Sequence, residues 1–102
     1  MSSKPQFQSN LDVIKRLASQ RGTDFEYSGH ADEEMASDHI DKLDLRNSLM
    51  NASNVIEQFD EIGPKFVVTG KDTNERVITS VIRITEIPPE VFVITVWEVK
   101  RR

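Results

Sequence analysis

The stretch that decides the fold class runs from Arg76 to Val99 and reads RVITSVIRITEIPPEVFVITVWEV. Its two halves, Arg76–Thr85 and Val91–Val99, are rich in valine, isoleucine, threonine and aromatic residues, which favour β-strands. The break between them, residues 86–90, is short and contains two prolines. A break of this length predicts antiparallel neighbours, because a parallel crossover needs about a dozen residues or more.

The residues between Val55 and Thr69 add two more strands. Val55–Asp60 and Lys65–Thr69 contain strand-forming residues, and residues 61–64 and 70–75 form short breaks with turn residues. Four strands joined only by short turns predict a four-stranded antiparallel β-meander.

Upstream of these strands the apolar residues recur with the spacing of helices. Phe25–Tyr27 fits either a short strand or a simple connector. The sequence therefore predicts an α+β fold, with two or three N-terminal helices packed on one face of the β-meander. The helices are expected after the N-cap Ser9, from His30 to Asp38, and from Lys42 to Asn51 behind the N-cap Asp41.

Composition limits the class of protein. The chain has 102 residues, which is the length of one domain. Of these residues 37% are hydrophobic and 29% charged, an ordinary composition for a globular protein. No cysteine is present, which excludes disulfides, a thiolate zinc site and a cysteine nucleophile. With no long apolar run and no signal-peptide pattern, we expect a cytoplasmic protein without membrane association. Residues 1–8 are predicted to be disordered, residues 9–99 to form a single domain, and residues 100–102 to form a basic tail.

Charge is distributed unevenly along the chain, whose formal net charge is −4. Residues 24–62 contain eleven acidic residues against two basic ones, whereas the two ends are mildly basic. The acidic residues are explained either as the solvated faces of two helices or as a docking face for a basic protein partner. Glu33, Glu34 and Asp38 are the candidate residues for such a face.

A motif begins at Ser28 and includes His30, Ala31, Met35 and Ile40, and the last strand closes with the residues ITVW at 94–97. In this order and spacing, the chain resembles a family of small bacterial domains of unknown function. The pattern of that family is S-x-H-A-x-x-[RE]-M-x-x-[RD]-x-I, followed by a short helix and a β-meander that ends in I-T-V-[YW]. The resemblance extends over about residues 25–99.

That family looks related to the RelE/BrnT superfamily of toxins. The resemblance implies helices packed on a twisted antiparallel sheet, membership of a toxin–antitoxin module and activity as an mRNA endoribonuclease. At the two positions where the family pattern allows arginine, this chain carries Glu34 and Asp38. These two acids remove positive charge from a phosphate-binding site.

A metal-independent ribonuclease needs a general base, a general acid and cations at the phosphate. Histidine is the residue type that most often exchanges protons near neutral pH, so His30 is the candidate acid or base, with Arg76 and Arg83 as candidate catalytic cations. The alternative for His30 is a structural hydrogen bond at a helix start. Lys65, Lys71 and Trp97 are candidate nucleic-acid contacts, although a tryptophan in an apolar strand is more often part of the core.

Two function hypotheses follow. The first is a toxin-type endoribonuclease that acts on RNA and is held by an antitoxin. The alternative is a non-catalytic protein-interaction module whose acidic helical face binds a basic partner. Neither hypothesis requires a metal or another cofactor. The strand Val55–Asp60 is expected at an edge of the sheet, where a second copy of the chain would form a homodimer.

Overall fold

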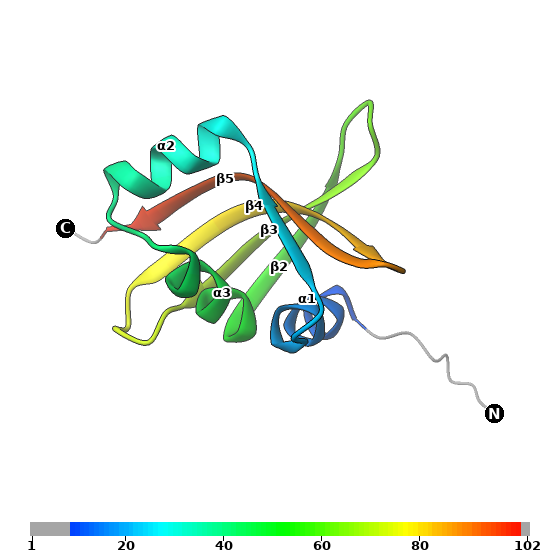
Figure 1. Cartoon of the computed structure of the whole chain (residues 1–102), viewed down its shortest axis with the longest axis horizontal. Helices are drawn as coiled ribbons and strands as arrows, with labels where there is room; N and C mark the ends of the chain where they lie inside the picture. The colour runs from blue at the N-terminus through cyan, green and yellow to red at the C-terminus, as the bar shows by residue number, and fades with distance from the viewer. Residues whose placement is uncertain (1–8, 101–102) are drawn as a thin grey trace.

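The computed structural model describes residues 9–100, and these form three helices and five strands (Figure 1). Residues 1–8, predicted to be disordered, and residues 101–102 of the predicted tail lie outside this part. The elements, in chain order, are α1 (Asn10–Ser19), β1 (Asp24–Tyr27), α2 (Gly29–Ser37), α3 (Lys42–Met50), β2 (Ala52–Phe59), β3 (Pro64–Lys71), β4 (Val77–Glu86) and β5 (Pro89–Val99).

The predicted α+β fold is confirmed, with one additional strand in the sheet. The strand order is β1-β5-β4-β3-β2, and the pairs from β2 to β5 are antiparallel, as the short breaks predict. Phe25–Tyr27 belongs to a strand, β1, which pairs parallel to β5 through a register that places Phe25 opposite Val91. The sheet is therefore mixed and five-stranded rather than an antiparallel meander of four. The connection from β1 to β5 runs through α2, α3, β2, β3 and β4, so no local pattern reveals the parallel pairing.

Side chains at the helix starts explain where the helices begin. The Ser9 hydroxyl accepts a hydrogen bond from the Asp12 N–H at the start of α1. Asp41 and Asp44 bond to each other's backbone N–H groups in a capping box at the start of α3. Both predicted N-caps are confirmed.

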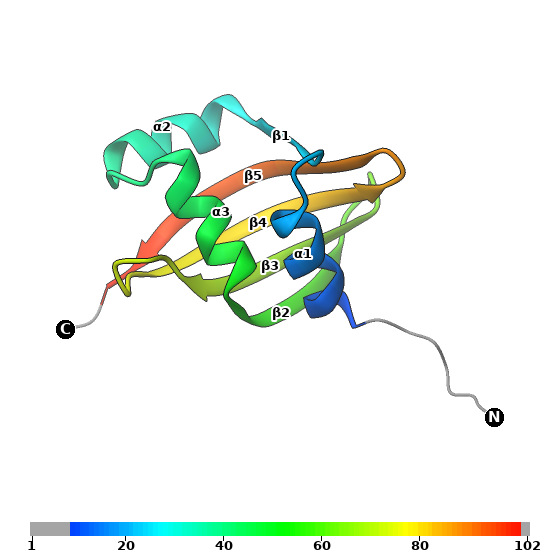
Figure 2. The ribbon, with the colours of Figure 1, turned by 60° about the horizontal axis from the view of Figure 1, so that its bottom comes forward.

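Helices α1 and α3 cover one face of the sheet, and Figure 2 shows both in front of the strands. Their buried residues, among them Leu17 and Leu49, join Ile78, Ile82 and Val93 of the sheet in one apolar core. Helix α3 and the sheet approach closely at Gly70, where an added Cβ would lie 2.0 Å from the Ser48 carbonyl oxygen. Only glycine leaves room for this contact.

The two edges of the sheet differ. β2 is the outermost strand on one side, so Val55–Asp60 lies at an edge as expected, and the homodimer stays a prediction. On the other side β1 covers only the first half of β5, and α2 continues along the same edge (Figure 2). Within residues 9–100 no helix is long and apolar enough to cross a membrane.

Candidate functional site

Among residues 9–100, no helix packs along the face of the sheet opposite α1 and α3, and we call it the open face. The register places Val67 and Thr69 of β3 opposite Val81 and Thr79 of β4. Thr79 in turn lies opposite Trp97 of β5. Because side chains alternate along a strand, these residues point away from the buried Phe66, Val68 and Ile78. The open face comprises Ile56, Lys65, Val67, Thr69, Lys71, Val77, Thr79, Val81, Arg83, Phe92, Thr95, Trp97 and Val99.

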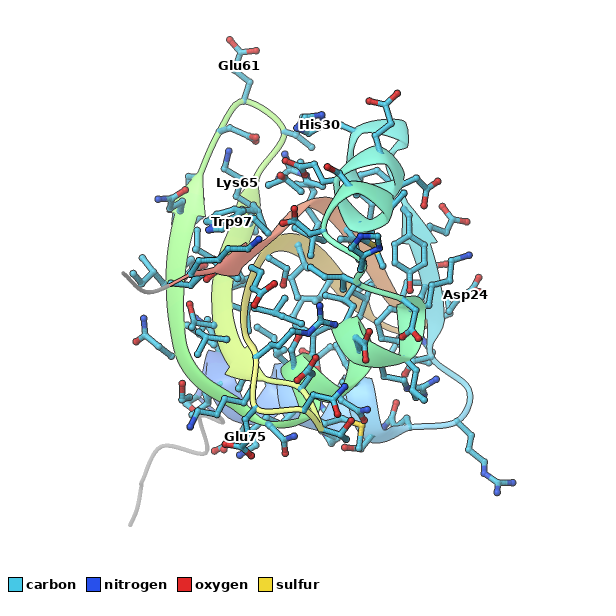
Figure 3. All side chains as sticks on the ribbon, turned by 90° about the vertical axis from the view of Figure 1, so that its left-hand side faces the viewer. Asp24, His30, Glu61, Lys65, Glu75 and Trp97 are labelled. Carbon is cyan, nitrogen blue, oxygen red and sulfur yellow. The ribbon has the colours of Figure 1, made fainter. Side chains whose placement is uncertain are left out.

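Four of the residues predicted to contact RNA share this open face. Lys65 and Lys71 are on β3, Arg83 is on β4 and Trp97 is on β5, at alternating positions that point the same way. In Figure 3, Lys65 and Trp97 lie between the β2–β3 hairpin, whose tip carries Glu61, and α2, whose first turn carries His30. Figure 1 shows the same hairpin and α2 rising on the side of the sheet away from α1 and α3.

Large apolar side chains are exposed on the open face. Trp97 and Phe92 each retain 39% of their accessible surface, and Ile56 and Val99 are also exposed. Trp97 is therefore not sealed in the core, which was the alternative considered for it. Several large exposed apolar side chains on one face of a small domain favour a binding surface there.

Cations flank these apolar residues at the hairpin. The Arg83 guanidinium donates to the Asp60 carboxylate and to the carbonyl oxygens of Gly63 and Pro64, while the Lys65 Nζ lies 3.6 Å from the same Asp60 carboxylate. The hydrogen bond from Arg83 is the largest influence on the Asp60 carboxyl and holds its pKa well below the usual range. One carboxylate thus positions two cations at one end of the open face.

Arg76 lies on the opposite side of the sheet. It directly precedes β4 and is two residues from the buried Ile78, and side chains two residues apart along a strand point to the same face. Its guanidinium donates to the carboxylates of Asp72 and Asp44, both at 2.9 Å, and its Nη1 donates to the backbone carbonyls of Asp38 and His39. The hydrogen bond to Asp72 is the main reason that the pKa of Arg76 is raised. Arg76 connects the β3–β4 turn to the α2–α3 loop.

Asp72 is a partner of Arg76 that the sequence analysis did not identify. Its carboxylate accepts hydrogen bonds from the backbone N–H groups of Asn74 and Arg76 as well as from the guanidinium. Burial is the largest single influence on the pKa of Asp72 and would raise it, but these hydrogen bonds together lower it. An aspartate in a turn commonly accepts a hydrogen bond from the backbone N–H two residues on, and Asp72, in the break at residues 70–75, carries this sequence signal.

His30 lies at the start of α2, with 68% of its side chain exposed, and its Nε2 is 3.2 Å from a Glu34 carboxylate oxygen. His30 lines neither the cleft between β1 and α3 nor the cleft beside Arg76. The positions of the two arginines show that His30, Arg76 and Arg83 do not all belong to one centre. The two arginines are on opposite sides of the sheet, and each is already in an ion pair.

Two of the predicted docking acids face inward. One Glu34 carboxylate oxygen accepts hydrogen bonds from the Val96 N–H and the Thr95 hydroxyl, and an Asp38 carboxylate oxygen accepts from the Glu98 N–H. These two acids take the place of a neighbouring strand along the half of β5 that β1 does not cover. Only Glu33 of the three predicted acids is fully exposed.

The rest of the motif fixes α2 to the same edge. The Ser28 hydroxyl accepts from the Ala31 N–H as the N-cap of α2 and donates to the Ile94 carbonyl of β5. Ala31 and Met35 enter the core. The motif residues therefore make the contacts that hold α2 against β5, and these contacts explain the spacing of the motif without any catalytic role. Within residues 9–100 no cluster of three or more potential metal ligands occurs.

A protein-family model matches residues 27–98, which is well over half of the chain, and its description is Domain of unknown function (DUF4258). The chain therefore belongs to the DUF4258 family. No curated protein and no solved structure matches it, so no relative of known activity is identified by these comparisons.

Proposed function

We propose that this DUF4258 domain binds single-stranded RNA on the open face of its sheet. The observation that supports this most directly is that Trp97 and Phe92 are exposed on the same face as Lys65, Lys71 and Arg83. Single-stranded nucleic acids bind to aromatic side chains that stack with bases, combined with cations that contact phosphates. RNA is also the substrate class that the resemblance to RelE/BrnT toxins implies.

The arrangement along the strands suits an extended chain of nucleotides. Trp97 and Phe92 are both on β5 and offer two stacking surfaces. Lys65 and Arg83 lie toward the hairpin and Lys71 toward the opposite end of β3, so phosphates at both ends of a short segment meet a cation. Asp60 would share its two cations with the bound phosphate.

We propose binding without cleavage. A ribonuclease brings an acid or base and phosphate-binding cations to one scissile bond, whereas here the two candidate arginines, Arg76 and Arg83, lie on opposite sides of the sheet. Arg76 is held by Asp72 and Asp44 on the other side of the sheet, and His30 is paired with Glu34. The alternative, docking of a basic protein on α2, has less support, since Glu34 and Asp38 bond to β5.

Binding is tested by fluorescence anisotropy of a labelled 12-nucleotide single-stranded RNA, with the intact RNA checked on a denaturing gel. Trp97→Ala is expected to weaken binding about tenfold, the loss of one base-stacking contact. Lys65→Gln is expected to weaken binding. It should also reduce the slope of the logarithm of the binding constant against the logarithm of salt concentration by about 0.7. The matched controls are Leu43→Ala and Lys42→Gln, an exposed apolar residue and a lysine on α3, which should leave the affinity unchanged. Absence of binding at low salt by the folded protein would refute the proposal.

A further inference from the structure

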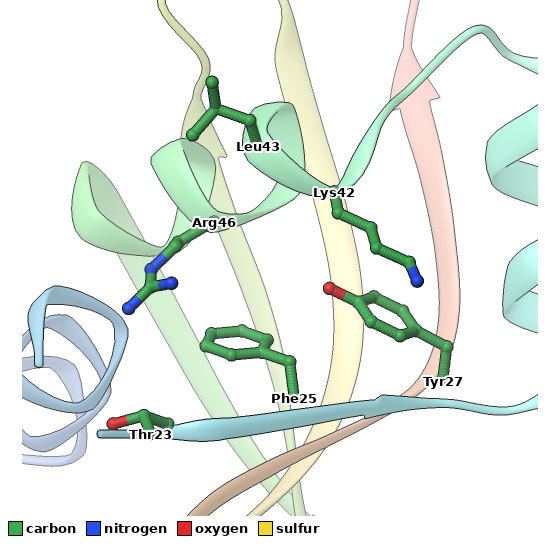
Figure 4. Close-up of a pocket in the computed structure, with 6 residues that line it drawn as sticks. All are labelled: Thr23, Phe25, Tyr27, Lys42, Leu43 and Arg46. Atoms are coloured by element: carbon green, nitrogen blue, oxygen red, sulfur yellow. The ribbon is translucent and has the colours of Figure 1, made fainter. Parts of the chain in front are cut away.

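A second surface lies on the other side of the domain, between the edge strand β1 and helix α3. It is a cleft of about 330 Å³ lined by Thr23, Phe25, Tyr27, Lys42, Leu43 and Arg46 (Figure 4). The rings of Phe25 and Tyr27 form its floor, 6.5 Å apart and inclined by 25°. Leu43 on α3 is 64% exposed at its rim, so it contributes little to the core.

Two cations lie over the two rings. The Lys42 Nζ is 4.9 Å from the centre of the Tyr27 ring, and the Arg46 guanidinium is 5.2 Å from the centre of the Phe25 ring. Arg46 is held in place by hydrogen bonds to the Ala18 and Gln20 carbonyls at the end of α1. Among residues 9–100 neither cation forms a salt bridge with an acid, so the cleft presents uncompensated positive charge in a strongly acidic part of the sequence.

The backbone of β1 is available beside this cleft. Ser28 donates to the Val93 carbonyl, so in this parallel pair the backbone groups of Ser28 and Glu26 face β5. The N–H and C=O groups of Phe25 and Tyr27 therefore point away from the sheet. β1 is the outermost strand, and these groups form a free edge to which a further strand can pair.

We propose that this edge and cleft together bind an extended peptide segment of another protein, one that adds a strand to β1. Its side chains on the α3 side would be apolar and acidic, an apolar one against Phe25 and Leu43 and a carboxylate between Lys42 and Arg46. Its side chains on the other side would be basic, opposite the exposed Asp24 and Glu26. Main-chain hydrogen bonds supply affinity in this binding mode, and the alternating side chains supply specificity.

A second copy of the chain does not fit this edge. Pairing β1 with β1 would place Asp24 and Glu26 of the two copies on the same side of adjacent strands, and like charges in such positions are destabilising. The charge pattern of the edge, acids on one side and cations on the other, is instead complementary to a strand with the opposite alternation. This surface is separate from the open face, so its test is independent of RNA binding.

The test is a titration of the ¹⁵N-labelled protein with a capped hexapeptide, Thr-Leu-Lys-Glu-Lys-Leu, followed by NMR. The amide signals of residues 25–27 and 42–46 are expected to shift, and those of β3 to stay unchanged. A peptide with glutamine in place of glutamate is expected to bind about fivefold more weakly, the effect of one partly exposed ion pair. A peptide with proline in place of the lysine that precedes the glutamate lacks one backbone N–H and should not bind.

The variant Lys42→Gln completes a double-mutant cycle with the glutamine peptide. It is expected to weaken binding of the glutamate peptide about fivefold and to leave the glutamine peptide unaffected, because only the former has a carboxylate for Lys42. The proposal is overturned if the glutamate peptide produces no shifts at millimolar concentration or if the shifts map to the open face. Equal binding of the proline peptide, or an equal effect of Lys42→Gln on both peptides, would overturn it as well.

Discussion

Replacement of Arg76 by glutamine tests whether this residue holds the fold together rather than contacting RNA. The substitution removes a guanidinium that bonds to two carboxylates and two backbone carbonyls from three different segments. The most serious consequence falls on Asp72, whose residue is only 2% exposed. Its carboxylate would keep its charge and lose its counter-ion.

The magnitude follows from the burial of the pair. Removing one partner of a buried ion pair costs about 3–5 kcal/mol. The Arg76 side chain is 23% exposed, and two backbone N–H groups still bond to Asp72 in the variant, so the expected loss is smaller. We expect Arg76→Gln to lower the free energy of unfolding by about 2–3 kcal/mol, a large part of the stability of a domain of this size.

Urea unfolding followed by circular dichroism measures this loss. The matched control is Arg83→Gln, whose single carboxylate partner Asp60 is exposed, so its expected cost in stability is smaller than that of Arg76→Gln. RNA affinity should respond in the opposite order, with Arg83→Gln weakening it and folded Arg76→Gln leaving it unchanged. A stability loss below that of Arg83→Gln, or a clear loss of RNA affinity in Arg76→Gln, would refute the assignment of Arg76 as a structural anchor.

Three further predictions concern the same fold. Hydrogen bonds lower the pKa of Asp72 from 3.8 although burial opposes this, so ionised Asp72 stabilises the fold above about pH 4. The free energy of unfolding should therefore fall as the pH drops below about 4, and this fall should be smaller in Arg76→Gln than in the unchanged protein. Glu34→Ala removes the acceptor of the Val96 N–H, so it should cost about 1–2 kcal/mol of stability and speed amide hydrogen exchange at Val96. Glu34→Gln keeps an acceptor oxygen and should change both quantities less. Equal exchange rates at Val96 in the unchanged protein and both variants would contradict the role of Glu34. Gly70→Ala places a Cβ 2.0 Å from the Ser48 carbonyl oxygen and should destabilise by about 3 kcal/mol, against at most about 0.5 kcal/mol for Gly22→Ala, which meets no atom within 4 Å, as thermal unfolding of both variants will show.

Local patterns predicted most of the fold because they reflect local physics. The strands β2 to β5 follow from alternation and short turns, and the N-caps Ser9 and Asp41 follow from side chains that bond to N–H groups three residues away. The parallel pairing of β1 did not follow, because its register depends on Val91 and Val93, more than sixty residues along the chain. A four-residue strand carries no signal for so distant a partner.

The candidate site was predicted in part for the same reason. Strand periodicity places Lys65 and Trp97 on particular faces of their strands, and the register then brings them to one surface. Arg76 has the residue type of a phosphate ligand, but its partners Asp44 and Glu98 are distant in sequence, so only the structure reveals the ion pairs. Similarly, Glu34 and Asp38 read as exposed helical acids until β5 is placed beside them.

Because Trp97 is the only tryptophan in the chain, its fluorescence reports directly on the open face. Titration of the unlabelled protein with single-stranded RNA should produce saturable quenching or a spectral shift of this fluorescence, with a midpoint that rises steeply with salt and rises further in Arg83→Gln. Fluorescence that stays constant while the RNA binds would place the nucleic acid elsewhere, and constant fluorescence with no binding would remove the open face as an RNA site.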